Sequence, residues 1–260
     1  MGVTLKEEDG REWTLLELLA EGFQLVANDG EHIPIIDANG RVFVSACGAP
    51  RNDTTSRGGR PDWRETRSVA LHAILECREE AGLDSCFKVS QPDLFNLYGT
   101  TLRDLLSRHP QLRPNFPPEV SVFAAANFNM GPQTVTIGHY DSKNLGWGMC
   151  IVFVDGNFNH KLGGHLILWD LRMVVEFPMG SCIILPSALI KHANIPIQPG
   201  ESRYSFTQYT AAGLFRWVAN GFKSDLAFSE TASSEALDGQ QRERELAWEW
   251  GLSLLSMIPA

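Results

Sequence analysis

The chain has 260 residues, of which 43% are hydrophobic and 20% charged, a composition that excludes wholesale disorder. No apolar run reaches about 18 residues, which excludes a transmembrane helix. This length favours one large domain with attachments over two equal domains. The net charge of −9 argues against a nucleic-acid partner, but the charge is uneven: residues 51–67 hold five arginines against three acids, and residues 225–249 hold seven acids against two arginines.

The first 117 residues are predicted to form a mixed α/β support. Helical spacing of apolar residues predicts three helices, over residues 13–21, 66–81 and 93–107. Apolar runs bounded by turn residues predict three strands, over residues 23–27, 33–36 and 41–45. Residues 50–64 are polar and rich in glycine and arginine, which predicts a loop.

The character of the sequence changes near residue 118. Short apolar runs separated by Gly, Pro, Asn and Asp predict strands over residues 120–126, 134–139, 149–154, 165–168, 173–177, 182–185 and 204–210. Helical patterns return over residues 211–222 and 235–257. We therefore expect one α+β domain over residues 1–260, with support in 1–117, a β-sandwich or jelly-roll core in 118–222 and an acidic helical tail in 223–260.

Several common protein classes lack their sequence signatures here. The start of the chain has no apolar signal-peptide stretch, so we expect a soluble intracellular protein without a membrane partner. The five cysteines are odd in number and form no C-x-x-C pair, which favours reduced thiols over a disulfide framework or a structural zinc site. No P-loop, H-E-x-x-H or G-x-S-x-G motif occurs.

A set of metal-ligand and anion-binding residues stands out in the β-rich core. His139 and Asp141 lie two apart at the end of a predicted strand, so both side chains can face the same way, and His192 follows a later buried run. Two histidines and one carboxylate form the facial triad of non-haem Fe(II) oxygenases. Arg203 can hold the far carboxylate of 2-oxoglutarate through two hydrogen bonds, and the Ser205 hydroxyl can support it.

Other assignments remain open at this point. His160 or His165 could be the distal histidine ligand instead of His192. Asn129 or Asn127 could contact 2-oxoglutarate, or could pack in the core or form a turn. Arg57 and Arg60, in the basic loop 51–67, could contact a DNA backbone or could lie in a solvated loop.

These residues give the chain its resemblance to the TET/JBP branch of Fe(II)/2-oxoglutarate dioxygenases, and most closely to the fungal, transposon-associated members. The matching stretch runs from about residue 120 to 222 and includes NFNMGP (127–132), HYDSKN (139–144), GGHLILWDL (163–171), FPMGS (177–181), residues 186–194, GESRYSFTQY (200–209) and GLFRW (213–217). The hairpin around residues 37–41 and the loop ending at Pro61 are also similar to this group. The cysteine-rich zinc-binding region of TET proteins is absent.

The resemblance implies a double-stranded β-helix that oxidises methyl groups on DNA bases. It assigns Fe(II) to His139, Asp141 and His192, 2-oxoglutarate to Arg203, and base contact to Asn144, which could instead cap a turn. Tyr140 stands where an arginine is common in the family motif, so its role in substrate binding is open. O2 is the cosubstrate, and the methylated base must leave the DNA stack to reach the iron.

The expected function is therefore oxidation of 5-methylcytosine, demethylation of N6-methyladenine, or both, by a nuclear, monomeric enzyme. The alternatives are the same chemistry on RNA, a protein or a small molecule, and a DNA-binding pseudoenzyme. The presence of all three expected metal ligands and Arg203 argues against a pseudoenzyme, because a non-catalytic protein has no need to keep the four residues.

Overall fold

The computed structural model describes residues 11–28, 31–47, 83–114, 116–129 and 131–258. The basic loop 51–67, with Arg57 and Arg60, and the helix expected over 66–81 lie outside these ranges. Within them, no helix is both long and apolar enough to cross a membrane.

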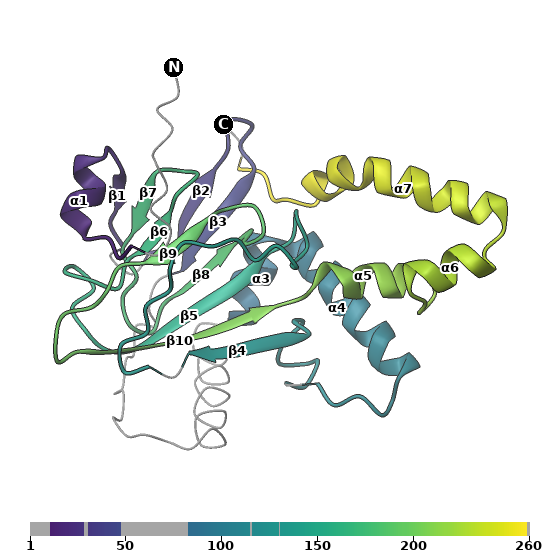
Figure 1. Ribbon diagram of the computed structural model, residues 1–260, viewed down its shortest axis with the longest axis horizontal. Coiled ribbons are helices and arrows are strands. Elements are labelled where there is room, and N and C mark those ends of the chain that lie inside the picture. The colour runs from purple at the N-terminus through teal and green to yellow at the C-terminus, as the bar shows by residue number, and fades with distance from the viewer. Residues whose placement is uncertain (1–10, 29–30, 48–82, 115, 130, 259–260) are drawn as a thin grey trace.

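The strands of the described ranges form two sheets (Figure 1). The smaller sheet has four strands, in the order β1 (Gln24–Val26), β7 (Met173–Val175), β6 (Leu166–Leu168) and β9 (His192–Asn194). The larger sheet has six, in the order β2 (Ile33–Ile36), β3 (Val42–Cys47), β8 (Cys182–Leu185), β5 (Cys150–Asn157), β10 (Ser202–Tyr209) and β4 (Ala125–Asn129). Neighbouring strands are antiparallel except for the parallel pair β1 and β7.

The two sheets pack face to face through one apolar core. Leu166 and Leu168 of β6 meet Ile183 and Leu185 of β8 in a single buried cluster. Alternate residues of the same strands point outward, because side chains alternate across a strand. Ile167 of β6 accordingly belongs to a different cluster, on the outer face of the smaller sheet. A continuous apolar run such as that of β8 is therefore what a strand buried on both faces requires.

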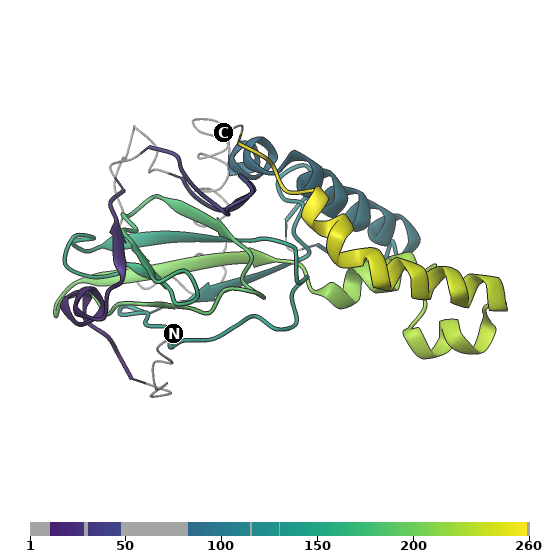
Figure 2. The ribbon, with the colours of Figure 1, turned by 90° about the horizontal axis from the view of Figure 1, so that it is seen from above.

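The described helices are α1 (Leu15–Ala20), α3 (Leu83–Ser90), α4 (Pro92–Arg108), α5 (Ala212–Ala219), α6 (Asp225–Thr231) and α7 (Ser234–Ser253). Helices α1, α3 and α4 cover the outer faces of the two sheets. Leu18 of α1 packs on the smaller sheet, and α3 and α4 pack on the larger one through Phe87, Leu94 and Tyr98. Helices α4 to α7 gather at one end of the sheets (Figure 2).

The expected α+β class is confirmed, but several expected elements are wrong. Residues 120–124 form no strand; Val122 and Phe123 are buried by packing between helix and sheet, which explains the apolar run. Residues 134–139 also form no strand. There the Asn194 side chain accepts a hydrogen bond from the Thr136 amide (2.7 Å) and donates one to the Thr134 carbonyl (3.2 Å), so a side chain replaces part of a strand ladder. Strand β9 and helices α3 and α6 were not expected.

Candidate metal and 2-oxoglutarate site

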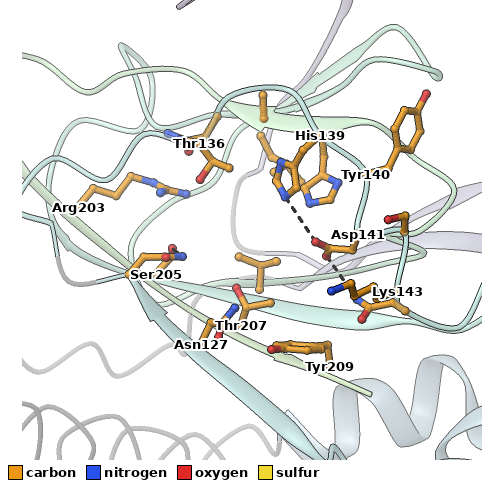
Figure 3. A pocket seen from close by; sticks show the side chains of 18 residues that line it. Asn127, Thr136, His139, Tyr140, Asp141, Lys143, Arg203, Ser205, Thr207 and Tyr209 are labelled. Atoms are coloured by element: carbon orange, nitrogen blue, oxygen red, sulfur yellow. Dashed lines mark hydrogen bonds and ion pairs between the residues drawn. The ribbon is translucent and has the colours of Figure 1, made fainter. Parts of the chain in front are cut away.

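A pocket of about 420 Å³ opens between the two sheets (Figure 3). Alternate residues of β10, namely Arg203, Ser205, Thr207 and Tyr209, line it, whereas Phe206 points to the opposite, helix-covered face. Figure 3 shows Arg203 on one side of the pocket and the pair His139 and Asp141 on the other. Asp141 is the one acidic side chain among the 18 lining residues, so this pocket combines a single carboxylate with a buried cation.

The two histidines are placed by a short antiparallel pairing of their backbones. The His139 amide donates to the His192 carbonyl (3.1 Å), and the His192 amide donates to the His139 carbonyl (3.0 Å). Residues that face each other in such a pair project their side chains to the same side. The ring centroids lie 4.3 Å apart as a result. Side-chain alternation along a predicted strand at 134–139 is thus the wrong reason for this geometry; the isolated bridge to β9 provides it.

Backbone carbonyls select the ring nitrogens that remain available for a metal. Nδ1 of His139 lies 2.9 Å from the Ile137 carbonyl, and Nδ1 of His192 lies 2.9 Å from the Ile190 carbonyl. A carbonyl can only accept, so each Nδ1 carries the proton when the ring is neutral, and each Nε2 keeps its lone pair. This arrangement is the usual outer support of metal-binding histidines.

Asp141 is the third residue of the candidate metal site, beside His139 and His192. Its Oδ1 lies 3.5 Å from Nε2 of His139, and its amide donates to the Ser187 carbonyl (2.9 Å). Burial acts to raise the pKa of Asp141, but hydrogen bonds from His139 and Ser187 outweigh it and hold that pKa below its usual value. The hydrogen bond to Asp141 raises the pKa of His139, whereas burial lowers that of His192.

The donor set fits a ferrous ion. One ligand atom each from His139, Asp141 and His192 lies within 4.8 Å of the other two. Two imidazoles and one carboxylate on one side of an ion leave the remaining positions for other ligands, as in the 2-His-1-carboxylate triad. His165 is buried outside the pocket lining, and His160 does not line the pocket either. The structure therefore brings His192, and not His160 or His165, close to His139 and Asp141.

Arg203 supplies the anion-binding feature of the pocket. Its side chain is 2% exposed, and burial lowers its pKa to about 10, which leaves the guanidinium charged at neutral pH. Within the described residues, its Nε has no hydrogen-bond partner, and its Nη1 donates to the Thr134 carbonyl at 3.5 Å. Among the described residues, no carboxylate forms an ion pair with it. A buried, charged guanidinium with donors still available for hydrogen bonds can bind a carboxylate in a bidentate manner, such as one end of 2-oxoglutarate.

Polar side chains surround Arg203. Ser205 lies two residues along β10 and accepts a hydrogen bond from Nδ2 of Asn129 on β4 (2.9 Å). The pairing of Ser205 with Asn129 in the sheet register explains this contact. Both line the pocket, as does Asn127. The structure thus brings the expected 2-oxoglutarate residues together beside the histidines.

Several lining residues were missed from the sequence. Thr207 and Tyr209 continue the alternation of Arg203 and Ser205, so the pattern R-x-S-x-T-x-Y could have revealed them. Asn194 follows His192 by two residues in β9 and could have been found in the same way, had β9 been predicted.

Asn144 and Tyr140 occupy different surroundings. Nδ2 of Asn144 donates to the Ser187 hydroxyl (3.1 Å) and to Oδ2 of Asp141 (3.4 Å), so its amide orients the Asp141 carboxylate. Tyr140 is 45% exposed, and its hydroxyl donates to Oδ1 of Asp170 (3.2 Å). Both side chains line the pocket on the side of the metal ligands.

Replacing Asn144 by alanine is expected to weaken iron binding by about 10-fold, because the Asp141 carboxylate loses a donor that orients it. Iron affinity and the turnover of 2-oxoglutarate without substrate should fall together. Ser142→Ala, in the exposed neighbour that also lines the pocket, is the matched control. Should iron affinity and uncoupled turnover stay normal while substrate oxidation is lost, Asn144 contacts the substrate instead.

Comparisons with known proteins give distant likenesses. No protein-family model matches the sequence, and no curated protein matches it significantly. Among solved structures, the chain is similar to NgTET1 in complex with 5mC DNA, with a TM-score of 0.40 and 13% identity over 76% of this chain and 89% of that one. It is also similar to the viral collagen prolyl hydroxylase vCPH from Paramecium bursaria Chlorella virus-1 in its 2OG complex, with a TM-score of 0.24 and 14% identity over 42% of this chain and 68% of that one.

Proposed function

We propose that the protein is an Fe(II)- and 2-oxoglutarate-dependent dioxygenase that oxidises methyl groups on DNA bases. One observation carries the oxygenase part: a 2-His-1-carboxylate set and a buried arginine that pairs with none of the described carboxylates line the same pocket between two sheets. We assign the two sheets to a double-stranded β-helix, the fold implied by the TET/JBP-like motifs, and the chain to the fungal TET-like branch.

In this proposal, different residues of the pocket bind the iron and the 2-oxoglutarate. His139, Asp141 and His192 would hold the iron, and Arg203 with Ser205 would hold the far carboxylate of 2-oxoglutarate. When bound, the two groups supply an O2-dependent oxidation in which 2-oxoglutarate becomes succinate and CO2, and one oxygen atom enters a C–H bond of the substrate. The hydrogen bonds to Ile137 and Ile190 keep both imidazoles oriented throughout.

The walls of the pocket favour a substrate that arrives from the side of the metal ligands. Arg203 and Leu166 are buried, which keeps water away from the 2-oxoglutarate end. Tyr140 and Lys143 line the pocket on exposed positions near Asp141. An exposed aromatic ring can stack on a flipped base, and a lysine can contact a phosphate, so this side suits a nucleotide.

The TET/JBP-like motifs are the main support for a methylated DNA base as substrate. Oxidation of the methyl carbon of 5-methylcytosine leaves a stable hydroxymethyl group. The same step on N6-methyladenine leaves a hemiaminal, which loses formaldehyde and restores adenine. A DNA substrate also underlies our proposal of a nuclear location, which imaging of the tagged protein in its native host would test.

The direct test supplies the protein with Fe(II), 2-oxoglutarate, O2 and duplexes carrying either 5-methylcytosine or N6-methyladenine. Succinate and modified nucleosides are then measured by mass spectrometry. We expect succinate to form in proportion to the oxidised or lost methyl groups. Succinate without any change in DNA would assign the same chemistry to RNA, protein or a small molecule. DNA binding without succinate under any condition would identify a pseudoenzyme.

The basic loop 51–67 provides a separate test of DNA binding. We expect Arg57→Ala with Arg60→Ala to weaken binding of methylated and unmethylated duplexes alike, because phosphate contacts are independent of sequence. The slope of log K against log salt should fall by about two units, since each contact contributes about 0.9. Affinity for 2-oxoglutarate should not change. An unaltered salt slope would move the DNA contact to other cations, such as Lys143, Lys161 and Lys191.

A further inference from the structure

Three of the five cysteines converge on the outer face of the larger sheet. Cys47 is the last residue of β3, Cys182 is the first residue of β8, and the two are direct partners in the sheet register. Cys86 belongs to α3, which lies against this face (Figure 1), and its side chain packs on the cluster that contains the other two. This cluster is separated from the 2-oxoglutarate pocket by the sheet itself, because the pocket opens on the opposite face.

The three sulfur atoms are close enough to share one ion. Each Sγ lies within 4.8 Å of the other two. A tetrahedral zinc ion with Zn–S bonds of about 2.3 Å holds its sulfur ligands about 3.8 Å apart, so small side-chain adjustments suffice. A disulfide would use only two of the three sulfurs, and all three are free thiols here. The spacing of the cysteines favoured reduced thiols over a structural zinc site, because that spacing gives no sign that three of the cysteines meet in space.

The three cysteines differ in their access to solvent. Cys47 and Cys182 are buried, whereas Cys86 is half-buried, so an ion could enter from the side of α3.

His32 lies beside the three cysteines, although its ring nitrogens are not within 4.8 Å of all three sulfur atoms. It precedes Ile33, which pairs with Ala46 in the antiparallel register of β2 and β3. Continuing the register by one residue sets His32 opposite Cys47, and directly opposed residues project to the same face. His32 is exposed and near enough for its charge to act on Cys86.

We propose that Cys47, Cys86 and Cys182 bind a structural zinc ion, with the exposed His32 side chain rotated inward as the fourth ligand. Three thiolates and one imidazole in a closed tetrahedral arrangement are typical of structural zinc. The ion would fasten α3 to β3 and β8. Helix α3 has eight residues, and a helix of that length depends on tertiary contacts for its stability. Cys47 and Cys86 also flank residues 48–82 in the sequence, so the same ion would join the two ends of that segment.

The test measures metal content in untagged protein that carries Asp141→Ala, so that zinc in the histidine–aspartate site contributes little. We expect about one zinc ion per chain by plasma mass spectrometry. Adding Cys86→Ser or Cys47→Ser should reduce this to a small fraction. Adding Cys150→Ser should leave it unchanged, because Cys150 is also a buried cysteine of the larger sheet but lies outside the cluster. His32→Ala should weaken zinc binding by about 10-fold or more, and an unchanged affinity would overturn its assignment as the fourth ligand.

Cobalt provides a readout that does not depend on whether the cysteine variants fold. Titrating the metal-depleted Asp141→Ala protein with Co(II) should produce thiolate-to-cobalt charge-transfer absorption and the visible bands of tetrahedral cobalt, and zinc should displace both. Absence of zinc from the purified protein, together with absence of these bands, would overturn the proposal. Loss of zinc in Cys150→Ser to the same degree as in Cys86→Ser would do so as well.

Discussion

His192→Ala and Asp141→Ala are each expected to abolish methyl oxidation and to weaken iron binding sharply, while the fold survives. Each change removes one of three protein ligands, and two ligands rarely retain a metal that three bind. The measurements are succinate formation, iron content after desalting, and the thermal unfolding midpoint. Asp141→Asn separates charge from shape, because it keeps a similar side chain without the carboxylate, and should lose iron as well.

His160→Ala is the matched control for the histidine ligand. His160 does not line the pocket, so its removal should leave iron content and turnover near the wild-type values. Full activity in His192→Ala, with loss of activity in a variant of His160 or His165, would show that the third ligand is wrongly assigned. If His192→Ala greatly lowers the unfolding midpoint, its loss of iron has two explanations, unfolding and the missing ligand. Iron content in Asp141→Asn, which keeps the shape of the side chain, then decides between them.

Arg203→Lys is expected to raise the KM for 2-oxoglutarate by about 10- to 100-fold while iron binding persists. Lysine keeps the positive charge but cannot form two parallel hydrogen bonds to one carboxylate. The loss corresponds to about 1.4 to 2.8 kcal/mol of binding free energy. The measurement is succinate formation at varied 2-oxoglutarate, together with direct titration of 2-oxoglutarate into the iron-loaded protein.

Arg216→Lys serves as the control for this change. Arg216 belongs to α5, is about half exposed and forms an ion pair with Asp225 at 3.6 Å, so it lies outside the pocket lining. Its substitution should not alter the KM. Were the effects reversed, with Arg203→Lys normal and Arg216→Lys impaired, the cosubstrate would lie near α5 and the pocket assignment would be incorrect.

Local patterns in the sequence were sufficient for much of the framework. Strands β2 and β8 form where short apolar runs predict them, and α4 begins and ends within about a residue of its prediction. Strand β9 (His192–Asn194) was missed because two of its three residues are polar, so no apolar run marks it. The expected strand over residues 134–139 failed for the opposite reason, since the side chain of Asn194 provides hydrogen bonds that no pattern at 134–139 could indicate.

By itself, the sequence determined the α+β class and the identities of the candidate ligands, because alternating and buried strands leave local apolar patterns and because H-x-D, a distal histidine and R-x-S are rare in combination. Only the tertiary structure decided that His192, rather than His160 or His165, joins His139, because a backbone pairing between distant segments makes that contact. The tertiary structure alone likewise decided that Arg203 is buried without an ion pair among the described residues, and that Cys47, Cys86 and Cys182 lie together. Partners that are distant in sequence come together only when the two sheets and α3 pack, and no local pattern records that packing.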